Sequence, residues 1–129
     1  MTSHLNIDAI GIVGAGAMGR GIAQIAALAG INVYLYDTSP VSVVAARQYL
    51  AETFEKLIAK GKLEAAGANA ALARVNVADS LGDLAPCNVV IEAIVESLDV
   101  KRGLFRELEK VIANDCVLAS NTSSLSITA

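Results

Sequence analysis

The chain has 129 residues, of which 54% are hydrophobic, and a formal net charge of −3 at pH 7. This length is typical of one domain with a single core, and the apolar content excludes a disordered chain. The acidic balance argues against nucleic acid or an anionic membrane surface as the main partner.

Strand-like and helix-like segments alternate along the chain. Short runs rich in Ile and Val predict five strands, at residues 9–13, 31–36, 74–77, 88–94 and 116–119. Apolar residues at helical spacing predict four helices, at residues 18–29, 40–60, 63–73 and 98–113. Ser39 is the expected N-cap of the second helix, with Pro40 at its first position. This order predicts an α/β fold: a doubly wound parallel sheet with a helical pair inserted after the second strand.

The cysteines, the histidine and the first apolar segment indicate whether disulfides, a metal site or a membrane span are expected. Cys87 and Cys116 lie in apolar surroundings without close spacing, which predicts buried free thiols rather than a disulfide. His4 is the single histidine, so no metal site is expected. The apolar segment that starts at Ala9 is interrupted by Arg20 before it could cross a bilayer, and a soluble, cytoplasmic protein is expected.

A glycine-rich turn joins the first strand to the first helix. The spacing G-x-G-x-x-G is formed by Gly14-Ala15-Gly16-Ala17-Met18-Gly19. Gly14 is expected to permit a tight turn, Gly16 to let a pyrophosphate approach the backbone, and Gly19 to let helix and strand pack closely. The N–H groups at the helix N-terminus would then bind the phosphates. These features predict a Rossmann-type domain that binds a dinucleotide.

Asp37 ends the second strand and selects the cofactor. A carboxylate at this position accepts hydrogen bonds from the 2′-hydroxyl of the adenosine ribose. A 2′-phosphate would face a like charge, at a cost of about 4 kcal/mol at close range, and neither position 38 nor position 39 is an arginine. The predicted cofactor is therefore NAD rather than NADP. Two alternatives remain, a glycine turn without a ligand and an Asp37 that only caps the next helix.

With these features the chain resembles the NAD-binding domain of the 3-hydroxyacyl-CoA dehydrogenases over nearly its whole length. Besides the glycine turn, the resemblance rests on Val90-Ile91-Glu92-Ala93-Ile94-Val95-Glu96, on Ala119-Ser120-Asn121-Thr122-Ser123-Ser124-Leu125, and on the insertion around Lys60-Gly61-Lys62-Leu63. That family oxidises the 3-hydroxyl of an acyl-CoA thioester to a ketone while NAD takes the hydride.

The resemblance implies roles for residues beyond the glycine turn. Glu96 and Lys101 are expected beside the ribose and nicotinamide half of NAD, with backbone contacts from Ile94 and Val95. Ser123 is expected where cofactor and substrate meet, with its hydroxyl near the reacting oxygen. Glu96 and Ser123 both follow predicted strands, at the edge where ligands of such sheets bind. A helix cap at Ser123 and an ordinary surface lysine at Lys101 are the alternatives.

The helical pair carries the residues that the resemblance assigns to coenzyme A. Thr53 and Lys60 match positions that contact it in the family, where the first is often serine. The two residues are seven apart and share one face of the predicted helix, although an exposed lysine at position 60 needs no ligand. Glu92 lies within an apolar strand and is expected to make a structural hydrogen bond.

The resemblance also implies parts that follow the present sequence. In this family the catalytic histidine and its partner glutamate come after the Asn-Thr-Ser-Ser tract, and a helical C-terminal domain completes the acyl pocket. Residues 1–129 are therefore expected to be a truncated NAD-binding domain, inactive alone, of an enzyme that is a homodimer when intact. Fatty-acid β-oxidation is the expected pathway, and butyrate and aromatic-acid degradation stay open. Two other functions stay open, a β-hydroxyacid dehydrogenase and a non-catalytic dinucleotide-binding module such as a sensor or a crystallin-like protein.

Overall fold

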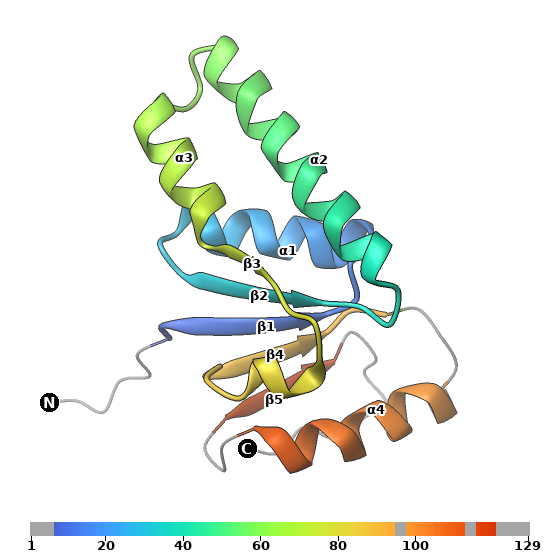
Figure 1. The fold of residues 1–129 in the computed structure, drawn as a ribbon. Coiled ribbons are helices and arrows are strands. Elements are labelled where there is room, and N and C mark those ends of the chain that lie inside the picture. Colours follow the sequence, from blue (N-terminus) through green and yellow to red (C-terminus); the bar gives the residue numbers. More distant parts are fainter. Residues whose placement is uncertain (1–6, 95–97, 113–115, 121–129) are drawn as a thin grey trace, which may run out of the picture.

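The computed structural model describes residues 7–94, 98–112 and 116–120 and is built around one parallel sheet. Its strands are β1 (Ala9–Val13), β2 (Asn32–Tyr36), β3 (Val75–Val77), β4 (Val89–Glu92) and β5 (Val117–Ser120). They lie in the order β3-β2-β1-β4-β5 (Figure 1). The predicted strands and the parallel sheet are confirmed, and the fourth strand is two residues shorter at its C-terminal end than predicted.

Helices connect successive strands, as predicted. They are α1 (Ala17–Leu28), α2 (Pro40–Ala59), α3 (Ala65–Ala73) and α4 (Leu98–Val111). A short 3₁₀ helix, η1 (Leu81–Leu84), was not predicted, and it begins with a capping box in which Ser80 and Asp83 bond each other's backbone. In the described part of the chain, no helix has the length and apolarity needed to cross a membrane.

The sheet is buried on both faces, which explains why its strands are apolar throughout. Ile12 on one face of β1 belongs to a core that includes Leu50 of α2, and α1 and α3 also pack there. Val13 on the other face belongs to a second core with Leu84 of η1 and Leu108 of α4. Helices on both faces confirm the doubly wound architecture.

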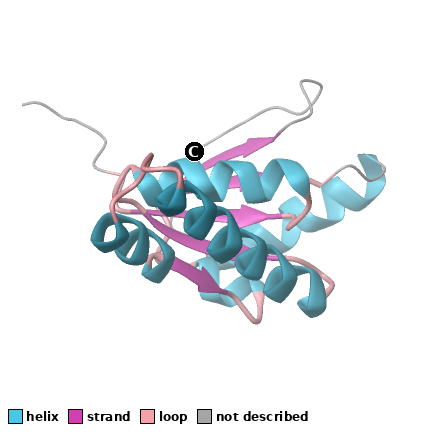
Figure 2. Cartoon of the chain, turned by 90° about the horizontal axis from the view of Figure 1, so that it is seen from above, coloured by secondary structure: helices cyan, strands magenta, loops and turns pink. Residues whose placement is uncertain are grey.

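The inserted pair α2 and α3 is tied to the sheet by arginines. Arg47 of α2 donates hydrogen bonds to the carbonyl oxygens of Leu72 and Val75, at 3.2 and 2.9 Å. Arg74 donates to the carbonyl of Ala27 in α1, at 2.9 Å. In Figure 2 the pair is nearest the viewer, with the strands behind it. These bonds fix the end of the pair that is next to the sheet, where α2 begins and α3 ends. The other end, where α2 turns into α3, extends away from the sheet (Figure 1).

Both cysteines are buried free thiols, as predicted. They lie in the core between the sheet and α4, where Cys87 and Cys116 are each 2% exposed. Burial, with a smaller contribution from the neighbouring Cys116, raises the pKa of the Cys87 thiol to about 12. Cys87 therefore stays protonated at neutral pH and behaves as a small apolar side chain.

Helix α1 meets the end of β1 at Gly19. A Cβ at Gly19 would overlap the carbonyl oxygen of Gly14, so only glycine lets the helix sit this close. Gly21 in the same helix has open space around the position of a Cβ. The two helical glycines thus differ only in what surrounds them.

Gly19→Ala is expected to lower the free energy of unfolding by about 3 kcal/mol, because helix and turn must separate to admit the methyl group. Gly21→Ala is the matched control and is expected to raise it by about 0.5–1 kcal/mol through helix propensity. Urea unfolding of both variants measures the difference. Equal effects of the two substitutions would contradict the proposed packing.

Candidate functional site

The candidate site lies where the carboxyl ends of the central strands align. Val13 at the end of β1 is in register with Tyr36 of β2 and with Glu92 of β4. From β1 the chain first builds the sheet toward β3 and then returns to build it toward β5, so the order reverses between β1 and β4. Ligands of open α/β sheets bind at such a reversal, outside the strand ends.

The three glycines of the turn serve three different purposes. Gly14 has a φ of +116°, donates its N–H to the carbonyl of Tyr36 at 2.7 Å, and is closely covered by Ala93. Gly19 provides the helix contact described above. Gly16 is exposed, and among the described residues no atom beyond its two chain neighbours lies within 4 Å of the position that a Cβ would take. The fold itself therefore needs Gly14 and Gly19, whereas Gly16 keeps a space open in front of the backbone.

That open space faces the beginning of α1. Gly16 is the N-cap residue, and it provides no side-chain cap; the first turn of the helix contains no acidic residue. Ala17 and Met18 begin the helix there and are exposed. A helix N-terminus of this kind favours an anion, and the free space at Gly16 lets a pyrophosphate reach the backbone. The residues present thus fit the phosphates of a dinucleotide.

Asp37 links the glycine turn to the start of α2. Its carboxylate accepts the N–H of Ala15 at 2.8 Å and the N–H of Ser39 at 2.9 Å, one on each oxygen. Ser39 is the N-cap residue of α2 as predicted, but its side chain makes no capping bond to the described residues, and Asp37 bonds its backbone instead. Ionised carboxylate oxygens each accept more than one hydrogen bond, so capping does not prevent Asp37 from binding a ribose.

Beside Asp37 a mostly apolar cavity of about 210 Å³ opens between the sheet edge and α4. Val13, Ile94 and Leu104 line it together with the polar residues Asp37, Thr38 and Glu107. Its size and lining suit a flat heterocyclic base whose ribose lies against the carboxylate. Ile94 was predicted to contact the cofactor; the participation of Leu104 depends on how α4 packs and was not predicted.

Glu92 is fully buried at the end of β4 and bonds the backbone of Ile94, which lines this cavity. Its carboxylate accepts the N–H of Ile94 at 2.6 Å. The structural hydrogen bond expected of this residue is confirmed. The bond turns the chain at Ala93, which explains why β4 ends before the predicted strand does.

The structure describes only some of the remaining predicted residues. Thr53 lies on α2 and donates its hydroxyl to the carbonyl of Tyr49 at 2.8 Å, while Lys60 is the exposed C-cap of α2. Thr53 lies in the second half of α2, and Lys60 directly follows that helix, which extends away from the sheet (Figure 1). The backbone of Lys101 is in α4. The other predicted residues, Val95, Glu96 and Ser123, lie outside the described residues, as does His4.

The family model and two relatives described below all point to 3-hydroxyacyl-CoA dehydrogenases or fatty acid oxidation. The family model for the NAD-binding domain of 3-hydroxyacyl-CoA dehydrogenase matches residues 9–129. The 3-hydroxybutyryl-CoA dehydrogenase of Bradyrhizobium diazoefficiens is 40% identical over 122 residues, which cover 95% of this chain and 42% of that protein. The fatty acid oxidation complex subunit alpha of Psychrobacter cryohalolentis is 36% identical over 123 residues, covering 95% of this chain and 17% of that protein.

A solved structure agrees with these sequences. The crystal structure of (S)-3-hydroxybutyryl-CoA dehydrogenase from Ralstonia eutropha superposes with a TM-score of 0.87 at 40% identity, covering 94% of this chain and 43% of that one. The chain therefore spans less than half the length of these relatives.

Replacement of Asp37 by Asn should weaken NADH binding about tenfold, because the ribose loses a charged acceptor. The preference for NADH over NADPH should narrow at the same time, since the like charge that opposes a 2′-phosphate is gone. Titration calorimetry with both nucleotides measures the change, and Asp8→Asn, an exposed site at the opposite edge of the sheet, is the control. An Asp37→Asn chain that folds and binds NADH normally would contradict the assignment.

Proposed function

The chain belongs to the 3-hydroxyacyl-CoA dehydrogenase family as an NAD-binding domain, and from this we propose that it holds NAD in an enzyme that oxidises 3-hydroxyacyl-CoA to 3-oxoacyl-CoA. The observation that carries the proposal is the open space at Gly16, placed between the α1 N-terminus and Asp37. A glycine turn that served only the fold would not need a glycine there.

The proposal assigns each part of NAD to residues along the carboxyl edge of the sheet. The turn from Gly14 to Gly19 binds the pyrophosphate, Asp37 the adenosine ribose, and the cavity at Ile94 the adenine. NAD supplies the acceptor for the hydride that leaves C3 of the substrate. Glu96 and Lys101 orient the nicotinamide half, and Ser123 lies beside the reacting oxygen; the motifs at these positions support the assignment.

Proton removal from the substrate hydroxyl requires a base within hydrogen-bond reach. We assign that step to a histidine and glutamate pair in a second part of the enzyme, as the family resemblance implies. The greater length of the relatives supports this assignment. Residues 1–129 are then an NAD-binding domain that is inactive alone. The match to the family model favours this function over a β-hydroxyacid dehydrogenase and over a module without catalysis.

The proposal extends to the cellular setting. The enzyme acts in the cytoplasm on acyl-CoA during fatty-acid β-oxidation, as a homodimer and without nucleic acid or membrane partners. Similarity to the fatty acid oxidation complex supports the pathway, and the acidic net charge is consistent with the absence of polyanionic partners.

A chimaera tests the proposed function. In it, this chain replaces the matching segment of the Bradyrhizobium 3-hydroxybutyryl-CoA dehydrogenase. The chimaera is expected to oxidise 3-hydroxybutyryl-CoA with NAD, and much more slowly with NADP, while the chain alone forms no NADH.

Gly16→Val in the chimaera is the decisive control. The valine Cβ meets none of the described atoms, so the variant should fold with only a small loss of stability at the helix N-cap, yet the side chain fills the space for the pyrophosphate and should abolish oxidation. Gly67→Ala in α3, which also has open surroundings, should leave oxidation unchanged and raise the stability by about 0.5–1 kcal/mol through helix propensity. A folded Gly16→Val chimaera with full activity would refute the proposed role of the turn.

A further inference from the structure

The cavity beside Asp37 contains a second carboxylate, which comes from a different part of the fold. Asp37 directly follows β2, whereas Glu107 belongs to α4 and lines the same cavity of about 210 Å³. The rest of the lining is apolar except for Thr38, whose hydroxyl donates to Asp37 at 3.5 Å. With Asp37 assigned to the ribose, Glu107 is the charged group that this lining leaves to the base.

Helix α4 presents Glu107 next to an open surface. Gly103, Leu104 and Glu107 line the cavity from one side of the helix, and Glu107 lies about one turn, or about 6 Å, beyond Gly103. Outside its own helix and its chain neighbours, none of the described atoms lies within 4 Å of the position that a Cβ on Gly103 would take. A planar base can therefore lie over Gly103 and meet Glu107 at its edge.

The carboxylate of Glu107 retains capacity to accept a hydrogen bond. Its Oε2 pairs with Lys110 at 3.1 Å, and its Oε1 accepts no hydrogen bond from the described residues. The side chains of this pair are 60% and 70% exposed, and exposed ion pairs of this kind are weak. Each oxygen of an ionised carboxylate accepts more than one hydrogen bond, so Glu107 is available to a donor in the cavity.

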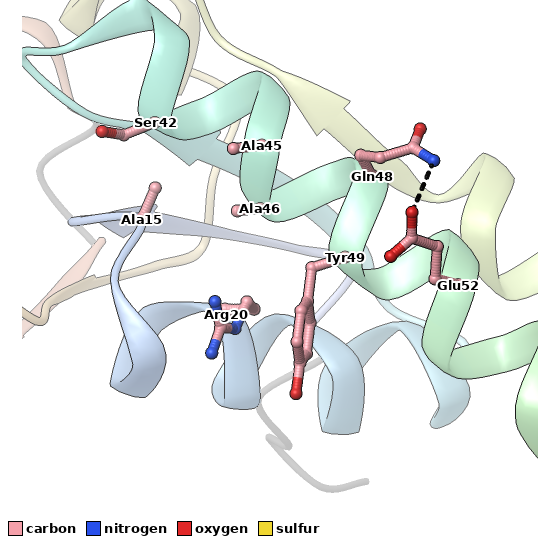
Figure 3. Close-up of a pocket in the computed structure, with 8 residues that line it drawn as sticks. All are labelled: Ala15, Arg20, Ser42, Ala45, Ala46, Gln48, Tyr49 and Glu52. Atoms are coloured by element: carbon pink, nitrogen blue, oxygen red, sulfur yellow. Dashed lines mark hydrogen bonds between the residues drawn. The ribbon is translucent and has the colours of Figure 1, made fainter.

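A groove between α1 and α2 differs from this cavity because it contains a cation. It has a volume of about 450 Å³, and the guanidinium carbon of Arg20 lies there 3.8 Å from the ring centroid of Tyr49, with Glu52 as the carboxylate (Figure 3). The residues that line the cavity beside Asp37 include two carboxylates and no cation. Like charges disfavour a phosphate in that cavity, whereas an uncharged base with an N–H donor suits it.

We propose that Glu107 selects the base of the cofactor by accepting a hydrogen bond from the 6-amino group of adenine. The inference rests on the proposed function and adds a residue that determines specificity to its adenine site. The amino group is the N–H donor of the base once N9 carries the ribose. A 6-oxo purine would place a carbonyl oxygen opposite the carboxylate, with no proton between the two acceptors.

The test is titration calorimetry of the 129-residue chain with NADH and two analogues, one with a 6-oxo group (hypoxanthine) and one with hydrogen at C6 (purine). Because Glu107 is 60% exposed and water competes for it, NADH is expected to bind only about tenfold more tightly than either analogue. In Glu107→Gln the side chain gains an N–H donor for the 6-oxo group, so the preference over the hypoxanthine analogue should fall to about twofold or less.

Two matched variants separate the position of the carboxylate from its charge and its ion pair. Glu109→Gln removes the same charge from an exposed residue of α4 that does not line the cavity, and it should keep the full preference for NADH. Lys110→Gln breaks the ion pair but retains the carboxylate, and it should keep the preference as well.

Three results would overturn the inference and leave the proposed function intact. The first is equal affinity of the unsubstituted chain for NADH and both analogues. The second is a Glu107→Gln chain that keeps the full preference, since another residue would then select the base. The third is an equal loss of preference in Glu109→Gln, which would assign the effect to net charge. Failure of NADH to bind to the folded chain would instead refute the proposed function, on which the inference depends.

Discussion

The close approach of helix α1 to the end of β1 is the constraint on which the rest of the structure depends. It requires a residue without a Cβ at Gly19, because a side chain there would overlap the carbonyl oxygen of Gly14. Gly14 in turn takes a positive φ and fits against Ala93 of the neighbouring strand end. These contacts bring the helix N-terminus to the point where the strand order reverses, and Gly16 there faces an open space.

Asp37 and Glu92 stabilise the two sides of this space by the same means. Asp37 directly follows β2 and Glu92 is the last residue of β4. The carboxylate of Asp37 accepts the N–H groups of Ala15 and Ser39, and that of Glu92 accepts the N–H of Ile94. The fully buried Glu92 serves the local backbone turn, whereas Asp37 is half-buried at a cavity and has acceptor capacity left. The same residue type is thus structural at one strand end and available to a ligand at the other.

Most of the strands and helices and the glycine turn were predictable from the sequence. Buried parallel strands and amphipathic helices have distinct residue patterns, and the spacing of the glycines is typical of a turn between a strand and a helix. The role of Asp37 was only half predictable, because capping and ribose binding require the same residue at the same place. The helix η1 was missed since a single turn shows no periodicity. The groove at Arg20 and Tyr49 was missed too, because it depends on how α1 and α2 cross in space.

The most direct measurement of the central claim is an NMR titration of the isotopically labelled chain with NADH. The amide signals of Gly14 to Gly19, together with those of Asp37 and Ile94, should shift in a saturable manner with one bound NADH per chain. Signals from the far end of α2 and α3, including Lys60, should stay in place. Saturable shifts confined to that far end, or no shifts in a folded chain, would contradict a cofactor site formed by the glycine turn.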